Sequence, residues 1–191
     1  MDRAALDLVS LALEYPDAAV REALASAVPP EAELGPSLGG ALTRLRAWIA
    51  GTPAEEAEEA YTRLFDLSPG CTLHCGYHLF GDAYQRGALL AGLSAELRLA
   101  SVPVRDGELP DFLPNLLRLA GRLPEGEGRA LLVDLVVRPA LARMNAALEG
   151  SAAPWAAFLA ALPEAIAPLG DGIEAPDFRP ETAPEEAFLH A

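Results

Sequence analysis

The spacing of the apolar residues is the feature that most constrains how this chain can fold. Leu6, Val9 and Leu13 near one end, and Leu90 and Leu97 further along, belong to runs in which apolar side chains return every three or four residues. That period is typical of amphipathic helices. No stretch shows the two-residue alternation rich in Val, Ile and Thr that marks strands. The pattern therefore predicts an all-α, single-domain helical bundle with short loops between neighbouring helices.

Turn and capping residues divide the first third of this pattern. A first helix is expected to end at Tyr15–Pro16, and Asp17 is placed to cap a second helix. Residues 28–40, rich in Gly and Pro, are predicted to form a loop. Ser37 is the candidate cap of the next helix, which Gly51 should end.

The middle of the chain has the clearest helix start and the longest periodic run. Thr52, Pro53 and Glu55 match a capping box, in which Thr52 would cap and Glu55 would reach back to it. Residues 77–99 are predicted to form one helix, with Tyr84 on its apolar stripe. Another helix is expected over residues 111–123, with Asp111 favourable in its first turn.

The last third is predicted to contain two further helices and a tail. Pro139 lies inside the periodic run 128–148 and should kink or break it, because proline lacks an amide donor and clashes with the preceding turn. A final helix begins near Pro154. We therefore expect a helical domain over residues 1–169 and a Pro-rich acidic tail over residues 170–191, with one turn near residues 185–189.

The charge balance bears on partners. Twenty-eight acidic residues face 14 basic residues, all of them arginine, for a formal net charge of −14. Such a surface repels nucleic acid and anionic lipid and attracts basic partners, although acidity also serves solubility alone. We see no secretory signal and no apolar run long enough for membrane insertion, and two cysteines make no disulfide framework. These features favour a cytoplasmic location and leave the oligomeric state open.

Both cysteines and two of the three histidines lie close together, as Cys71, His74, Cys75 and His78. On a helix they would share one face, but residues seven apart are separated by about 10 Å along the axis. The ligands of a tetrahedral zinc ion lie within roughly 4 Å of one another. A disulfide across four helical residues is marginal. We therefore favour structural roles and keep a Cys/His metal site or thiol sensor as an alternative. No catalytic motif is present, which favours a binding protein.

Three separated stretches resemble one family. They read LALEYPDAAV (11–20), AYTRLFDLSPGCTLHCGYHLFGDAYQRGALLAGL (60–93) and ELPDFLPNLLRLAGRLP (108–124). Together they resemble the nitrate reductase molybdenum-cofactor assembly chaperones of the delta-subunit type. The wider group of redox-enzyme maturation chaperones includes those for trimethylamine N-oxide and dimethyl sulfoxide reductases. The likeness runs in order from about residue 6 to residue 124.

This resemblance implies an all-helical fold, no enzymatic activity and no stably bound cofactor. Family members bind the N-terminal segment of the apo catalytic subunit of a molybdenum enzyme. They hold that subunit ready for molybdopterin guanine dinucleotide and delay its docking at the membrane. The expected client is respiratory nitrate reductase. The alternatives are a proofreading chaperone for a twin-arginine-exported dimethyl sulfoxide reductase-type enzyme, the Cys/His sensor, and a purely structural interaction domain.

The resemblance carries over residue by residue. The matching positions are Tyr61, Leu64, Phe65 and Asp66; Gly81, Asp82, Arg86 and Gly87; and Glu108, Leu109, Pro110 and Asp111. The family commonly has His after that Pro-Asp pair, where this chain has Phe112, so no role of that His is carried over.

A basic amphipathic leader would bind as a helix in an apolar groove, with its charges met at the rim. Such a groove needs aromatic and leucine side chains that solvent can reach. Arg86 is expected to pair with Asp82 or Asp111. The peptide-binding candidates are Tyr61, Phe65, Asp66, Tyr84, Arg86, Glu108, Pro110, Asp111, Phe112 and Leu116.

Overall fold

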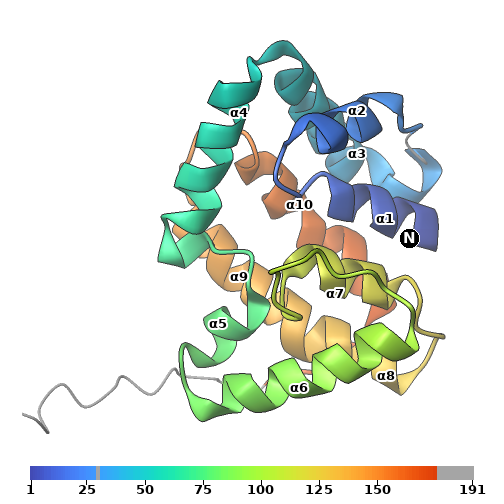
Figure 1. The fold of residues 1–191 in the computed structure, drawn as a ribbon. Coiled ribbons are helices and arrows are strands. Elements are labelled where there is room, and N and C mark those ends of the chain that lie inside the picture. Colours follow the sequence, from blue (N-terminus) through green and yellow to red (C-terminus); the bar gives the residue numbers. More distant parts are fainter. Residues whose placement is uncertain (29–30, 176–191) are drawn as a thin grey trace, which may run out of the picture.

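Helices account for the regular structure of this chain. The computed structural model describes residues 1–28 and 31–175, and within those ranges it contains no strand, so the all-α prediction is confirmed (Figure 1). The α-helices are α1 (Arg3–Leu11), α2 (Ala18–Ser26), α3 (Glu31–Gly51), α4 (Ala54–Tyr61), α5 (Cys75–Phe80), α6 (Tyr84–Leu99), α7 (Leu113–Ala120), α8 (Glu127–Leu131), α9 (Arg138–Ala147) and α10 (Ala156–Ile166). Two π-helical segments (Thr62–Asp66 and Leu132–Val137) and two 3-10 turns (Pro69–Cys71 and Ala167–Leu169) join them.

The helices pack around a core in which Trp155 is the largest fully buried side chain. Its indole Nε1 donates a hydrogen bond to the carbonyl oxygen of Ala12 at 2.9 Å, just after α1. Its ring makes edge contacts with Trp48 of α3, Tyr61 at the end of α4 and Phe65 of the π segment that follows. Helix α1 packs against α7, and α10 packs against α3 and α9. This aromatic cluster fixes the end of α4 against the rest of the bundle.

In the first third of the chain, the predicted cap of α2 and the predicted end of α3 are confirmed, and the predicted loop between these two points is wrong. The side chain of Asp17 caps α2 by accepting from the Val20 amide at 2.9 Å, and Gly51 ends α3. The predicted loop 28–40 is instead helical from residue 31, with one break at Gly35, whose φ is 66°. Glycine adopts that φ readily, and Pro36 suits a helix start, so Ser37 lies within the helix and does not cap it.

Three boundaries in the middle of the chain also differ from the prediction. Pro53, with an extended ψ of 145°, occupies the cap position of α4, and no side chain caps this helix, so the capping box headed by Thr52 is absent. The run 77–99 is divided at Gly81, whose φ is 60°, into α5 and α6. Helix α7 begins at Leu113, so Asp111 precedes its first turn. In each case a backbone angle outside the helical range, rather than polarity, sets the boundary.

The region around Pro139 stays helical. A π-helical segment, Leu132–Val137, joins α8 to α9, and Pro139 lies in the first turn of α9. The kink or break predicted at Pro139 is therefore absent, and a wider π turn precedes this residue instead.

The predicted tail begins in contact with the helices. Buried Asp134 accepts hydrogen bonds from the backbone amides of Asp171 and Ile173, each at 2.9 Å. The turn predicted near 185–189 lies outside the described residues. Among those described, no helix combines the length and the apolar character needed to cross a membrane.

Candidate functional site

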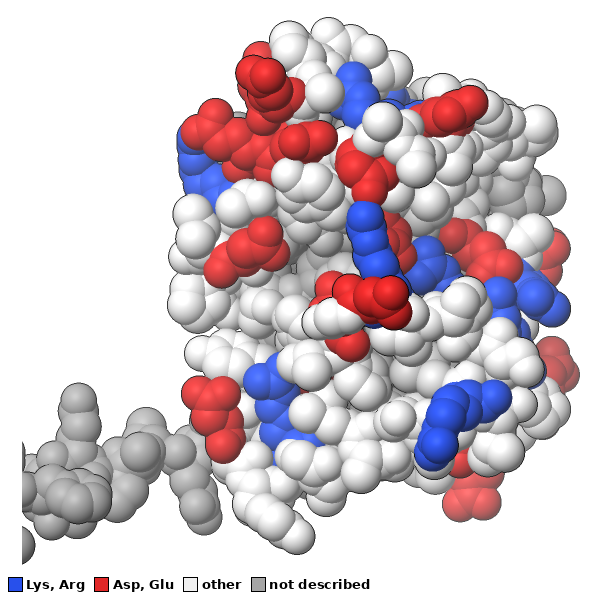
Figure 2. Space-filling view, in the orientation of Figure 1, with Lys and Arg blue, Asp and Glu red and all other residues white. Residues whose placement is uncertain are grey.

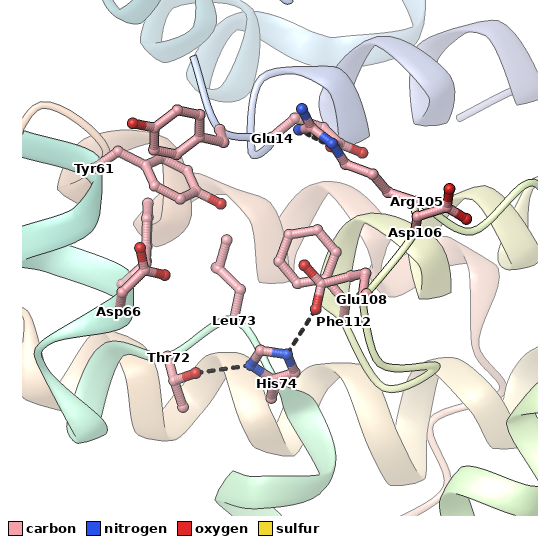
Figure 3. A pocket seen from close by; sticks show the side chains of 13 residues that line it. Glu14, Tyr61, Asp66, Thr72, Leu73, His74, Arg105, Asp106, Glu108 and Phe112 are labelled. Atoms are coloured by element: carbon pink, nitrogen blue, oxygen red, sulfur yellow. Dashed lines mark hydrogen bonds and ion pairs between the residues drawn. The ribbon is translucent and has the colours of Figure 1, made fainter. Parts of the chain in front are cut away.

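Four segments that are distant in the sequence surround a pocket of about 390 Å³. They are the turn after α1, the end of α4 with its π segment, residues 72–74, and the connector between α6 and α7. Figure 2 shows the pocket as a recess near the middle of this face, with acidic side chains on several sides. Its lining consists of Glu14, Tyr15, Tyr61, Phe65, Asp66, Thr72, Leu73, His74, Arg105, Asp106, Gly107, Glu108 and Phe112 (Figure 3).

The floor of the pocket is apolar and fixed. Tyr61, Phe65, Leu73 and Phe112 are all buried in the core while lining the pocket. The Tyr61 hydroxyl donates to the carbonyl oxygen of Leu13 at 2.9 Å, and its ring lies 4.8 Å from that of Phe65 between centroids. Burial raises the pKa of Tyr61 far above its ordinary value, so the phenol stays neutral. The floor therefore offers aromatic and aliphatic surface without charge.

The π-helical segment after α4 places two side chains in different environments. Phe65 points into the core, whereas Asp66 is exposed at the pocket edge. A π turn adds a residue to the helical repeat and shifts the side chains that follow it. The Tyr-x-x-Leu-Phe-Asp element thus supplies both an apolar floor residue and an acidic rim residue.

A polar network closes one side of the pocket. His74 Nε2 lies 2.9 Å from Glu108 Oε1, and His74 Nδ1 lies 3.0 Å from the Thr72 hydroxyl (Figure 3). Burial by itself would raise the pKa of Glu108. The hydrogen bonds from His74 and from the Leu109 amide outweigh that effect, and the pKa lies below its ordinary value. Glu108 is therefore a carboxylate at neutral pH.

Backbone hydrogen bonds fix the same two segments to each other. The Leu113 amide donates to the Leu73 carbonyl at 2.8 Å, and the Cys75 amide donates to the Asp111 carbonyl at 2.9 Å. Between them, His74 and Phe112 form an isolated antiparallel bridge. These bonds hold the connector against residues 73–75.

Acidic groups outnumber basic ones around this pocket and continue beyond it. Four carboxylates line it, those of Glu14, Asp66, Asp106 and Glu108, against the single guanidinium of Arg105. A second hollow of about 320 Å³ adjoins it along α4, with Glu55, Glu58 and Glu59 in its lining. Tyr15 lines both hollows, and its hydroxyl donates to Glu58 at 3.3 Å. The second hollow also contains Arg63, which pairs with Glu59, so a basic ligand would meet more carboxylates than guanidinium groups across the two hollows.

Comparison with known proteins decides the family. A sequence model of the family described as "Nitrate reductase delta subunit" matches residues 31–161. The chain belongs to that family. It is 29% identical over 147 residues to the nitrate reductase molybdenum cofactor assembly chaperone NarJ of Escherichia coli (strain K12), an alignment that covers 75% of this chain and 61% of NarJ. It is also 27% identical over 157 residues to the probable nitrate reductase molybdenum cofactor assembly chaperone NarW of the same strain, with 82% and 65% covered.

A third relative is much longer. The nitrate reductase-like protein NarX of Mycobacterium tuberculosis (strain ATCC 25618 / H37Rv) is 34% identical over 157 residues, which are 80% of this chain and 23% of NarX. The chain thus spans less than two thirds of the length of each of these relatives. The delta-subunit resemblance seen in the sequence motifs is confirmed.

Two motifs of this chain meet in an ion pair away from the pocket. Arg86 Nε lies 3.1 Å from Asp111 Oδ2, and Arg86 Nη1 lies 3.8 Å from Asp82, so both predicted partners are confirmed. The Asp111 side chain is fully buried and that of Arg86 is 16% exposed. Neither lines the pocket, and neither does Pro110. The pair ties α6 to Asp111, two residues before the start of α7.

The remaining apolar candidates lie at opposite extremes of exposure. Leu116 of α7 has no accessible surface and belongs to the core, so it does not meet the requirement that solvent reach it. Tyr84, the first residue of α6, is 90% exposed and lies outside the pocket lining, not in the buried stripe expected for it. Of the ten candidates, the structure therefore brings together Tyr61, Phe65, Asp66, Glu108 and Phe112.

The Cys/His cluster does not form a shared face, because α5 begins only at Cys75 and a 3-10 turn ends at Cys71. His74 faces Glu108, and His78 Nε2 donates to the Thr72 carbonyl at 2.7 Å. Burial raises the pKa of both thiols, which disfavours the thiolate that metal binding and redox exchange require. Within the described ranges, no three His, Cys, Asp or Glu side chains converge as metal ligands.

Sequence reasoning missed several lining residues. Glu14 and Tyr15 lie in the first of the three quoted motifs, LALEYPDAAV, and that motif was the available signal. His74 was considered only as a metal ligand. Arg105 lies in a connector without a recognisable pattern, and no sequence signal pointed to it.

Proposed function

We propose that this chain is an assembly chaperone for nitrate reductase. It would bind the basic N-terminal segment of the apo catalytic subunit in the acid-rimmed pocket and release it once molybdopterin guanine dinucleotide is in place. We place this role in the cytoplasm, where the apo subunit is made. The chaperone description of NarJ and NarW supports the general role. The leader-binding step is our inference from the pocket.

The combination of an apolar floor and an acidic rim is the observation that carries this proposal. An amphipathic helix buries its apolar side chains and keeps its basic ones at the edge. Tyr61, Phe65 and Phe112 offer the apolar contact, while Glu14, Asp66 and Glu108 offer opposite charge. The net charge of −14 would speed the encounter at low ionic strength. Binding and release need no covalent chemistry.

Isothermal titration with a synthetic leader peptide tests the proposal. The probe is the N-terminal segment of the nitrate reductase catalytic subunit from the same genome, and a peptide with its basic residues changed to glutamine is the control. We expect the basic peptide to bind at low salt and to weaken as salt is raised, and we expect the neutral peptide to bind much less. Equal binding of both peptides, or no binding of the basic one, would contradict the proposal.

A matched pair of variants localises the binding. Asp66→Asn removes one exposed carboxylate from the pocket edge, and Glu96→Gln removes one exposed carboxylate from α6. Because both change the net charge equally, only a contact at the pocket makes them differ. Asp66→Asn should weaken binding by roughly two- to fivefold, and Glu96→Gln should leave it nearly unchanged.

A proofreading role for an exported dimethyl sulfoxide reductase-type enzyme would show as preference for a leader with an intact twin-arginine pair. The matching family and the relatives named above favour nitrate reductase as client.

A further inference from the structure

A single basic side chain stands at the mouth of the acidic pocket. The Arg105 guanidinium places Nη2 at 2.5 Å from Asp17 Oδ2 and Nη1 at 3.8 Å from Glu14 Oε2. Its side chain is 52% exposed, whereas those of Glu14 and Asp17 are 11% and 31% exposed. Figure 3 shows Arg105 reaching from the connector toward Glu14 along the rim. The connector contributes the cation, and the turn after α1 contributes both carboxylates.

Each of these carboxylates uses one oxygen for the fold and offers the other to Arg105. Asp17 Oδ1 accepts from the Val20 amide at 2.9 Å and so caps α2, which leaves Oδ2 for the guanidinium. Glu14 Oε1 lies 2.7 Å from Arg118 Nη1 in α7, which leaves Oε2. The two carboxylates are therefore held in place by partners other than Arg105. A site that is already positioned binds its ligand with little loss of conformational entropy.

Arg105, in contrast, is itself half exposed and is held at its guanidinium by these two side-chain contacts. Water can reach the exposed half of the Arg105 side chain and competes for its charge, which limits what the contact contributes to stability. The connector itself is fixed further along, by the His74–Glu108 contact and the Leu113–Leu73 backbone bond. Rotation of the Arg105 side chain would therefore open the two carboxylates without moving the connector.

We propose that Glu14 and Asp17 form a guanidinium-binding subsite, which Arg105 fills in the free chaperone and an arginine of the client fills in the complex. The subsite favours arginine over lysine, because the planar guanidinium presents several donors in a fork that two carboxylates can share. This inference rests on the proposed function and names the client group recognised at the edge of the same pocket, which Glu14 and Arg105 line and Asp17 adjoins. Arg105 then acts as a built-in competitor, and its removal should tighten client binding.

The test is a set of titrations with the full chain. The probes are the leader peptide described above and the same peptide with citrulline, an uncharged isostere, in place of arginine. The variants are Arg105→Gln and, as a matched control, Arg98→Gln in α6, an exposed arginine whose Nε donates to the Ser94 carbonyl. Both variants make the net charge one unit more negative. We expect Arg105→Gln to lower the Kd of the arginine peptide by roughly two- to fivefold and to leave the citrulline peptide unchanged.

A second variant works in the opposite direction. Asp17→Ser keeps a capping oxygen for α2 while it removes the charge, so the fold should persist, as circular dichroism can verify. It should weaken the arginine peptide and not the citrulline peptide. Weaker or unchanged binding by Arg105→Gln, or a gain no larger than that of Arg98→Gln, would overturn the subsite while the proposed function stands. No binding of the leader to any of the proteins at low salt would overturn both.

Discussion

The side chain of Asp111 is fully buried, and it forms an ion pair with Arg86, which belongs to another of the sequence motifs. Its Oδ2 faces Arg86 at 3.1 Å, while Oδ1 has no hydrogen-bond partner among the described residues. A buried charge is tolerated only when it is paired, because its transfer out of water is expensive. The Gly-acidic-x-x-x-Arg-Gly element and the acidic-Pro-Asp element are therefore two halves of one structural contact. Their occurrence in a chaperone family does not require that they touch the client.

Removing that carboxylate should destabilise the protein strongly. Asp111→Ala leaves Arg86 without its buried partner, and we expect the free energy of unfolding to fall by roughly 3 kcal/mol, measured by urea denaturation. Asp82→Ala is the control, because that carboxylate is 90% exposed and lies 3.8 Å from the same arginine. The control should leave the midpoint nearly unchanged. Equal midpoints for the two variants would contradict a structural role for Asp111.

His78 gives the stability a defined pH dependence. Burial lowers its pKa below the ordinary value of 6.5, with Arg143 and His74 acting in the same direction. As pH falls below about 6.5, the unfolded chain takes up the proton first, so stability is present above that pH and is lost toward the folded pKa. His78→Gln should flatten the stability curve in this window, as denaturation at a series of pH values will show. An unchanged slope would mean that other groups set the dependence.

Helices α5 and α6 each contain a glycine, Gly76 and Gly92, and the surroundings of these two glycines differ. A Cβ added at Gly76 of α5 would lie 2.7 Å from Asp111 Oδ2 and 3.1 Å from a Leu89 methyl carbon, so glycine is needed for close packing. A Cβ added at Gly92 of α6 would meet nothing within 4 Å. Only the surroundings distinguish the two positions, since both glycines lie in helices.

Alanine substitutions at these glycines should have opposite signs. Gly92→Ala should raise the free energy of unfolding by about 0.5–1 kcal/mol, because alanine favours the helix. Gly76→Ala should lower it by about 1–3 kcal/mol, because the methyl group collides with a buried ion pair. Thermal and urea denaturation measure both changes. Stabilisation by Gly76→Ala would show that the contact around Asp111 is looser than described.

The helices themselves follow from local sequence, whereas several of their limits do not. Apolar spacing alone predicted the all-α class, and the position of Asp17 in the sequence correctly predicted that it caps α2. The breaks at Gly35 and Gly81 depend on positive φ angles. Every glycine can adopt such an angle, so the sequence does not show which glycines do, and packing selects them. The pocket was predictable only where motifs named its residues, such as Tyr61, Phe65 and Glu108. Arg105 joined it through contacts across 88 positions of sequence, which no local pattern encodes.

At the scale of the molecule, acidic side chains of several elements gather around two adjoining hollows. Helix α4 adds Glu55, Glu58 and Glu59 beside the second hollow, next to the acidic rim of the first. Charges this close to a binding surface steer a basic partner toward it, and salt screens the effect over about 10 Å at 0.1 M. Under the proposed function, the acidity of the chain would steer the client toward the pocket as well as aid solubility.

Neutralising α4 should slow association. Changing Glu55, Glu58 and Glu59 to glutamine should lower the association rate of the leader peptide at low salt and flatten its salt dependence, as stopped-flow fluorescence can measure. The control changes Glu96, Glu125 and Glu149, exposed acidic residues outside the lining of both hollows, and removes the same charge. If both triple variants slow association equally, net charge rather than its placement governs the encounter.

Locating the bound leader on the chain tests pocket binding most directly. A leader peptide that carries a photoreactive benzoylphenylalanine in place of one apolar residue can be cross-linked to the full chain at low salt, and the sites mapped by mass spectrometry. If the leader binds in the pocket, cross-links will concentrate in residues 61–74 and 105–112 and disappear when unlabelled leader competes. Cross-links spread over the surface, or gathered on a face remote from Tyr61 and Phe112, would contradict pocket binding.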